Sequence, residues 1–310
     1  MTAREDVTLD KGIHISVLLR EAADALSVKA GGRYVDGTLG RAGHAKEIIA
    51  RGGKVLGIDR DEQAIREVGE VEGLKAVCGR HGNLREIAHE IGWDEVDGVL
   101  LDLGVSSPQL DEAGRGFSFF REGPLDMRMD RSCGLSAADI VNEWSVERLE
   151  EIFRTWGEEP HSRRIARAIV RERARRPFRT TTGLASFVEG LVGRRGGRHP
   201  ATRVFQALRM AVNDEMGELE RALEGGIDML LPGGRFAVIA FESITDSKVK
   251  RFFAAHCGKM VSLQQGGERW EGILPRATAV TRGAVKASAA ETLSNPRARS
   301  ARLRAIERAA

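Results

Sequence analysis

The sequence has no stretch as long as the roughly 18 apolar residues that a transmembrane helix needs, and charges occupy the N-terminus, where a secretory signal peptide would be apolar. We therefore expect a cytoplasmic protein that does not span a membrane. Cysteine is scarce, because Cys78, Cys133 and Cys257 lie far apart and form no CxxC pair. This spacing predicts neither a disulfide framework nor a zinc site, and we expect no bound metal.

Acidic residues are almost absent from one region of the chain. Between His161 and Arg209 there are thirteen Arg, no Lys and only two acids, Glu172 and Glu189, which gives a local charge of +11. Because all 310 residues together carry +3, the remainder carries −8. The basic region is therefore expected to bind a polyanion.

The first third of the chain alternates short apolar runs with helical patterns. Four such runs end near residues 36, 59, 78 and 102. This alternation predicts parallel strands joined by crossover helices, in a doubly wound α/β sheet of the Rossmann-like type.

The alternation stops after Gly104, and about a hundred residues follow without a convincing strand. Helical patterns replace it, and Ser136 and Asp139 have the spacing of a capping box. A long helical pattern and the strand-like run RFAVIAF then resume the sheet pattern. We predict a discontinuous sheet domain at residues 1–108 and 208–310, with a basic, partly extended tail from about 294. An inserted helical domain would occupy residues 109–207.

Open sheets of this kind bind ligands outside the carboxyl ends of their strands. The first predicted strand ends in Asp36 and Gly37, and the second ends in Asp59, 22 residues after Gly37. A carboxylate there suits the two hydroxyls of a ribose. The G-x-G-x-x-G spacing of dinucleotide loops is absent, so S-adenosylmethionine, a nucleoside without phosphate, fits better than NAD. Tight turns, and capping of the next helix by Asp59, are the purely structural alternatives.

Six segments spread from His14 to Arg304 carry the most specific motifs. They are GIHISVLLREAADAL, YVDGTLGRAGHA, GIDRDEQAI, VDGVLLDLGVSSPQLDEAGRGFSFFREGPLDMRMD, HPATRVFQALRMAVNDE and NPRARSARLR. Together they resemble the MraW/RsmH family of S-adenosylmethionine-dependent methyltransferases, in which a helical domain interrupts a Rossmann-like domain. The resemblance implies methylation of a decoding-region cytidine of 16S rRNA on N4, with that RNA as partner, free or within the small ribosomal subunit.

The strand-end argument gives Asp36, Gly37 and Asp59 as donor-site residues, and the resemblance implies a set of seven that includes Asp59 again. They are Ala42, Gly43, His44, Asp59, Leu84, Asp102 and Gln109. We expect Asp59 to hold the ribose and Leu84 to cover the adenine, whereas Gln109 has a loop or capping role as its alternative. Methyl transfer mainly needs reacting atoms aligned about 3 to 3.5 Å apart, so the catalytic candidates are acceptors that would orient the amine. They are Asp102, Ser106, Ser107 and Asn213.

Arginine binds phosphate bidentately, so we expect RNA contacts from the basic region. The candidates are Arg163, Arg164, Arg167, Arg194, Arg195, Arg198 and Arg203, with a merely solvated helix face as the alternative. Phe117, Phe119 and Phe120 of RGFSFF could stack a base or pack into the core.

The chain departs from the family pattern at Arg41 and Ala42, where glycines are usual, at Leu84, where phenylalanine is usual, and from Glu242 onward. Glu242, Thr245 and Ser247 stand where the family generally has His, Glu and Arg. Two other functions stay open: methylation of another RNA base, and a non-catalytic ribosome-assembly factor on the same fold. The oligomeric state cannot be predicted from these patterns.

Overall fold

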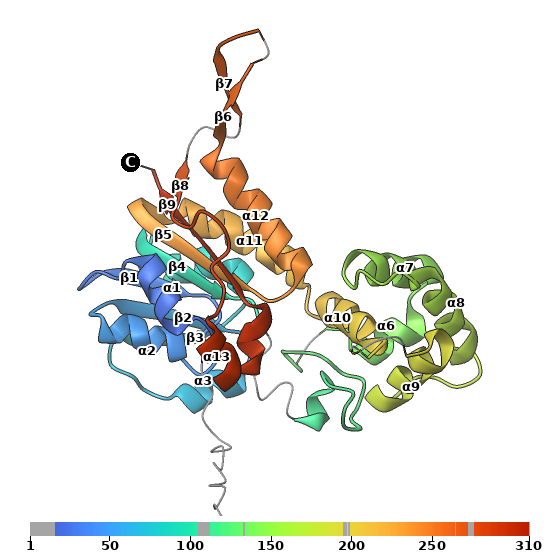
Figure 1. Ribbon diagram of the computed structural model, residues 1–310. Helices are drawn as coiled ribbons and strands as arrows, with labels where there is room; N and C mark the ends of the chain where they lie inside the picture. Colours follow the sequence, from blue (N-terminus) through green and yellow to red (C-terminus); the bar gives the residue numbers. More distant parts are fainter. Residues whose placement is uncertain are drawn as a thin grey trace, which may run out of the picture.

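The computed structural model describes residues 16–104, 112–132, 134–194, 197, 199–263, 265–271 and 276–309. Within these ranges a seven-stranded sheet has the order β3-β2-β1-β4-β5-β9-β8 (Figure 1). The first five of these strands are parallel, and β9 is antiparallel to both of its neighbours. The predicted α/β fold class is confirmed.

Four of the seven strands correspond to the four apolar runs predicted in the first third of the sequence. A hydrophobic core lies on each face of the sheet. The strands are β1 Arg33–Asp36, β2 Lys54–Asp59, β3 Leu74–Cys78, β4 Val96–Asp102, β5 Leu230–Ala240, β8 Ala277–Ala279 and β9 Arg302–Arg308. Successive side chains of a strand point to opposite faces, so Tyr34 is buried in one core and Val35 in the other.

Helices cover both faces of the sheet. One face packs against α1 Leu19–Leu26, α2 Gly43–Ala50 and α3 Glu62–Val68. The other packs against α4 Leu84–Glu90, α11 Glu215–Asp228 and α12 Ser243–Cys257. This layering leaves the strand ends as the place where a ligand can approach the sheet.

The inserted subdomain is a separate bundle beside the sheet (Figure 1). Its described helices are α6 Ala137–Glu143, α7 Val146–Thr155, α8 Ser162–Arg173, α9 Thr181–Val192 and α10 Ala201–Val212. They share a core of their own that includes Phe153, Ile165 and Leu208. The predicted capping box is present at α6, where the side chains of Ser136 and Asp139 each accept the other's backbone N–H. The domain limits near residues 108 and 208 remain predictions.

The expectation of a partly extended basic tail is wrong. β9 lies between β5 and β8, with Leu303 and Ile306 buried. Its positive charges are compensated, because the buried carboxylate of Asp246 accepts hydrogen bonds from Arg302 (3.0 Å) and Arg304 (2.7 Å). Neutralisation by α12 allows this arginine-rich segment to form an inner strand.

The remaining described elements are short. They are η1 His81–Asn83, η2 Ala113–Arg115, α13 Ala289–Ser294, η3 Pro296–Ser300 and the strands β6 Lys259–Ser262 and β7 Glu268–Glu271. β6 and β7 form a hairpin that stands away from the main sheet (Figure 1). Of the helices in the described ranges, none has both the length and the apolar character that a membrane span requires.

Candidate functional site

Three acidic strand ends meet at one edge of the sheet. β1 lies between β2 and β4, so the strand order reverses at the β1–β4 boundary. Open α/β sheets bind ligands at such a reversal. β1, β2 and β4 end in Asp36, Asp59 and Asp102, which are the acids that the sequence pointed to.

Thr38 connects the ends of β1 and β4, and sequence reasoning missed it. Its backbone N–H donates to Oδ1 of Asp36 (3.1 Å), and its hydroxyl oxygen accepts the backbone N–H of Asp102 (2.6 Å). The hydroxyl proton can in turn point to Oδ1 of Asp36 (3.4 Å). An Asp followed two residues later by Thr is typical of a side-chain turn, and this spacing was the available signal.

Asp36 and Asp102 have hydrogen-bonding capacity that the described protein does not use. Asp36 is 1% exposed, and burial raises its pKa to about 6. Burial also raises the pKa of Asp102 to about 7. Oδ2 of Asp36 and Oδ1 of Asp102 are buried and have no hydrogen-bond partner within the described ranges. Because a buried unpaired carboxylate is costly, these two oxygens fit a positively charged ligand group.

His44 lies beside both acids at the start of α2. Its Nδ1 is 3.9 Å from Oδ2 of Asp102, and its Nε2 is 3.1 Å from the carbonyl oxygen of Val17. Since a carbonyl only accepts, Nε2 carries a proton, and Nδ1 is an acceptor in the neutral ring. Burial lowers the pKa of His44, and the nearby Asp36 opposes this effect. A neutral ring leaves the charge of Asp102 uncancelled and donates no hydrogen bond to it.

Asp59 is fixed by backbone N–H groups on both of its oxygens. Oδ2 accepts from Gly40 (2.8 Å), and Oδ1 accepts from Asp61 (2.9 Å). Burial raises the pKa of Asp59, and these two hydrogen bonds oppose the rise. The cap of α3 is Asp61, which accepts the N–H of Gln63 (3.1 Å), so the capping alternative does not account for Asp59. Each oxygen of Asp59 keeps a lone pair that a ribose hydroxyl can use.

The glycine loop after β1 is constrained by packing. A Cβ on Gly37 would lie 2.5 Å from Leu101 Cδ2, and one on Gly43 would lie 1.9 Å from Ser16 Oγ. Ala42 adopts a left-handed conformation with φ 62°, which explains why glycine is favoured there, and its side chain is buried. The backbone of this loop, rather than its side chains, is therefore what can approach a donor.

Leu84 and Asn213 do not occupy the predicted positions. Leu84 is fully buried in the core between α4, α11 and the sheet, so it has no surface with which to cover an adenine. The side-chain amide of Asn213 donates to the carbonyl of Met127 (2.8 Å) and accepts the N–H of Met129 (2.9 Å). Asn213 therefore holds the inserted subdomain together and is not free to orient a target amine. Ser106, Ser107 and Gln109 lie outside the described residues.

His81 is a second group that the sequence reasoning missed. It begins η1, directly beyond β3, and its Cβ lies near Gly37 at the same edge. Burial lowers the pKa of His81 to about 4, and Arg60 adds to the effect. Its buried Nε2 has no partner within the described ranges. A neutral imidazole nitrogen there can hydrogen-bond a nucleoside base, and the signal in the sequence was a histidine just after the third strand.

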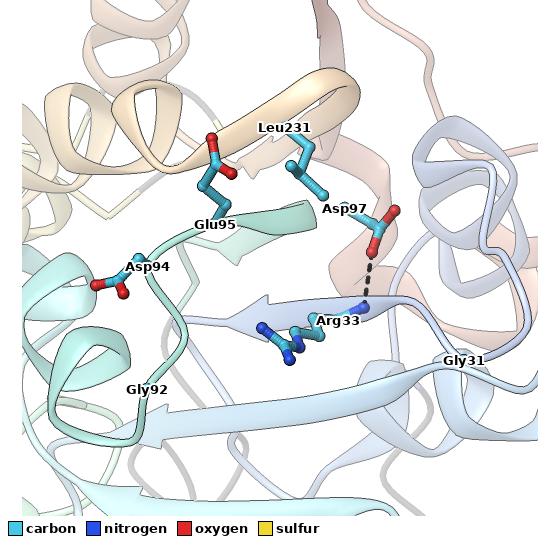
Figure 2. A pocket seen from close by; sticks show the side chains of 7 residues that line it. All are labelled: Gly31, Arg33, Gly92, Asp94, Glu95, Asp97 and Leu231. Atoms are coloured by element: carbon cyan, nitrogen blue, oxygen red, sulfur yellow. Dashed lines mark hydrogen bonds between the residues drawn. The ribbon is translucent and has the colours of Figure 1, made fainter.

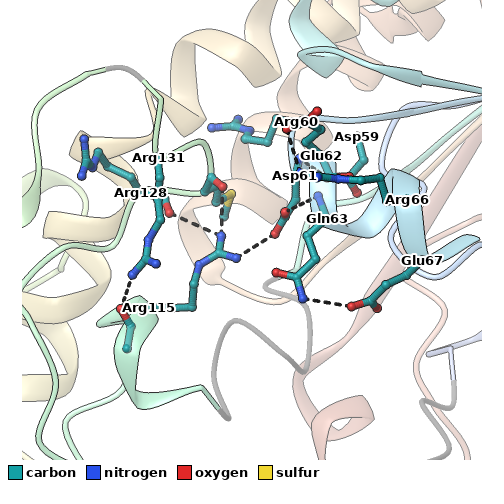
Figure 3. A network of polar contacts seen from close by, with 12 residues as sticks. Asp59, Arg60, Asp61, Glu62, Gln63, Arg66, Glu67, Arg115, Arg128 and Arg131 are labelled. Carbon is teal, nitrogen blue, oxygen red and sulfur yellow. Dashed lines mark hydrogen bonds and ion pairs between the residues drawn. The ribbon is translucent and has the colours of Figure 1, made fainter.

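The turn that holds Asp59 also anchors the inserted subdomain (Figure 3). The carboxylate of Asp61 accepts a hydrogen bond from Arg115 (3.0 Å), and these side chains are only 14% and 8% exposed. Arg115 also donates to the carbonyl of Met129 (2.9 Å). The buried pair therefore joins the donor edge directly to the inserted subdomain.

Glu242, the departure from the family pattern, shares one arginine with a second carboxylate. Arg209 donates to both oxygens of Glu215 (2.8 and 2.9 Å) and to Oε1 of Glu242 (2.9 Å). Burial alone would lower the pKa of Arg209, but the two carboxylates raise it above its ordinary value. Glu242 thus belongs to an internal charge network between α10, α11 and α12, in which one guanidinium pairs with two carboxylates, and its buried Oε2 has no hydrogen-bond partner within the described ranges.

The basic region is exposed on α8. Arg163, Arg164 and Arg167 are exposed, whereas Ile165 and Ile169 on the other face of the helix are buried. Of the other predicted RNA contacts, exposed Arg194 pairs with Glu189 (3.4 Å), and Arg203 is partly buried. Arg195 and Arg198 lie outside the described residues.

A pocket of about 320 Å³ lies at the opposite edge of the sheet (Figure 2). Its lining residues are Gly31, Arg33, Gly92, Asp94, Glu95, Asp97 and Leu231. Arg33 begins β1 and Asp97 is the second residue of β4, so these are the amino ends of the strands. The three acids make this pocket unfavourable for RNA, and it shares no residue with the three acidic strand ends.

Comparison with known proteins gives the family. The model of the MraW methylase family matches residues 11–309. The chain belongs to this family. A relative from Symbiobacterium thermophilum is 45% identical over 94% of this chain and 96% of its own length. One from Methylobacterium sp. is 49% identical over 95% and 90%, respectively, and both are named ribosomal RNA small subunit methyltransferase H. The expected class of enzyme, a methyltransferase that uses S-adenosylmethionine, is confirmed for this member of the family.

Proposed function

We propose that the chain transfers a methyl group from S-adenosylmethionine to the exocyclic N4 of a decoding-region cytidine in 16S rRNA. The observation that carries this proposal is the pair Asp36 and Asp102, each with a buried oxygen that finds no partner among the described residues, where the strand order reverses. The names of the relatives support small-subunit rRNA as the acceptor, and the exposed arginines of α8 support an RNA. We place this activity in the cytoplasm, where ribosomes assemble.

The donor site follows from the strand ends. Asp59 would accept the ribose hydroxyls, and Nε2 of His81 would face the base. Asp36 and Asp102 would face the cationic methionine end, because their free oxygens need a positive charge or a donor. When bound, S-adenosylmethionine supplies an electrophilic methyl group on a sulfonium.

Asp102 would be the catalytic residue closest to the acceptor. The N–C bond forms as the S–C bond breaks, and the exocyclic nitrogen then has one proton in excess. A carboxyl whose pKa burial raises to about 7 can take that proton near neutral pH. Ser106 and Ser107 follow Asp102 closely in the chain, and we propose that their hydroxyls help to hold the amine in line.

The inserted subdomain would hold the RNA. Arg163, Arg164 and Arg167 would contact phosphates, which gives affinity with little sequence preference. The Asp61–Arg115 pair keeps the subdomain joined to the donor edge. The proposed roles therefore separate the RNA contacts from the chemistry.

Methylation in cells tests the proposal. Nucleosides of 16S rRNA from cells lacking the gene are analysed by mass spectrometry after complementation with wild type, Asp102→Asn or the exposed control Glu72→Gln. Wild type and Glu72→Gln should restore N4-methylcytidine, and Asp102→Asn should not. If wild type restores a different methylated base, the enzyme acts on that base and not on cytidine N4. If wild type changes none of the nucleosides, a non-catalytic assembly factor is favoured.

A further inference from the structure

The RGFSFF segment contains one strongly exposed aromatic ring. Phe120 is 83% exposed, whereas Phe117 is buried and Phe119 is partly buried against the core of the inserted subdomain. Base stacking and core packing, the two roles that the sequence left open, therefore fall to different residues of the segment. Phe117 and Phe119 pack inward, and Phe120 does not.

The ring of Phe120 rests on a rigid aromatic base. The centroids of Phe119 and Phe120 are 5.0 Å apart, and Phe119 is in turn 4.7 Å from His199 and 4.8 Å from Phe205. Phe205 belongs to α10 and to the buried core. Because Phe119 packs against the Phe120 ring, this ring has less conformational entropy to lose when it binds a ligand.

Charged residues of both signs flank this ring. Arg121, the next residue, is exposed. His199, whose ring contacts Phe119, lies 3.3 Å from Glu189, and Arg194 lies 3.4 Å from the same carboxylate. Glu189 is one of only two acids in the +11 region. A single exposed apolar residue is ordinary on protein surfaces, but an exposed aromatic ring that is supported by other rings and followed by an exposed arginine is typical of single-stranded nucleic-acid sites.

We propose that Phe120 stacks on an unpaired base of the RNA substrate. The inference rests on the proposed function and specifies how the inserted subdomain recognises its substrate. Every base has a π-face, so such a contact selects single-stranded RNA without reading its sequence. It would also help to keep the target cytidine unstacked, as reaction at its amine requires.

The test compares an RNA hairpin whose loop has the decoding-region sequence with the same sequence closed in a duplex. Phe120→Ala should weaken binding to the loop by roughly five- to hundredfold, since that is the range of single stacking contacts, and should leave duplex binding unchanged. Phe120→Trp should keep the affinity, and its fluorescence should be quenched by the loop RNA. Leu293→Ala is the matched control, because Leu293 is 85% exposed on α13, outside the inserted subdomain.

The outcomes separate this inference from the function on which it rests. Equal loop binding by wild type and Phe120→Ala, or equal weakening for loop and duplex, overturns base stacking alone. Full affinity in Phe120→Leu shows that the ring is only an apolar contact, and it also overturns the proposal. If wild type binds neither RNA, the proposed function fails and the stacking contact fails with it.

Discussion

Replacing Asp102 with Asn should stabilise the protein at high pH while impairing its function. Burial raises the pKa of Asp102 to about 7, compared with an ordinary value of 3.8. The folded state thus keeps a proton that the unfolded chain loses, so this contribution to stability is fully present below about pH 4 and is lost as pH rises to 7. By linkage, the difference between the two pKa values amounts to about 4 kcal/mol at pH 8.

An amide carries no charge at any pH and escapes this loss. In the absence of S-adenosylmethionine, Asp102→Asn should therefore melt roughly 6 °C above wild type at pH 8 and close to wild type at pH 4.5. The conversion from free energy to melting temperature is that of a chain of this length. Thermal unfolding followed by circular dichroism at both pH values is the assay, with the exposed Glu72→Gln as control. A difference in melting temperature that is the same at pH 4.5 and pH 8 would show that the titration of Asp102 is not its source.

Three further predictions concern the ligands. Affinity for S-adenosylmethionine, measured by calorimetry, should rise about tenfold between pH 6 and 8 as Asp102 loses its proton, and less for the uncharged thioether S-adenosylhomocysteine; equal pH profiles would remove the charge argument. Asp59→Ala should weaken both ligands by roughly ten- to hundredfold through loss of the ribose contact, and unchanged binding would remove Asp59 from the site. Changing Arg163, Arg164 and Arg167 to Glu should weaken binding to unrelated RNAs and reduce the salt slope by roughly 0.7 to 0.9 per lost contact; a slope that does not change would leave α8 a mere surface.

The sheet was predictable because its signals are local. Short apolar runs ending in Asp36, Asp59 and Asp102 report parallel strands and their carboxyl ends, and the structure places all three acids together. The C-terminal strand was not predictable, since Arg302 and Arg304 give it the composition of a tail. Only the fold brings Asp246 to them, and a buried acid distant in sequence has no local signature.

The site was predictable in its acids and less so in its supporting residues. Leu84 and Asn213 were placed by resemblance and by chain position, but packing buries the first and hydrogen bonding occupies the second. Thr38 and His81 were missed because their roles depend on neighbouring strand ends that meet only in the folded sheet. Side-chain partners across a sheet edge are a property of tertiary structure rather than of the motif.

Transfer of isotopically labelled methyl groups by the purified protein tests the central claim most directly. The protein is incubated with labelled S-adenosylmethionine and with 16S rRNA, free or in small subunits, from cells lacking the gene, and the RNA is digested for nucleoside mass spectrometry. We expect label in N4-methylcytidine with the wild-type protein, and its loss in Asp102→Asn when S-adenosylmethionine is saturating. Label in 5-methylcytidine or in a methylated adenosine, or no transfer by the wild-type protein to either form of the RNA, would contradict it.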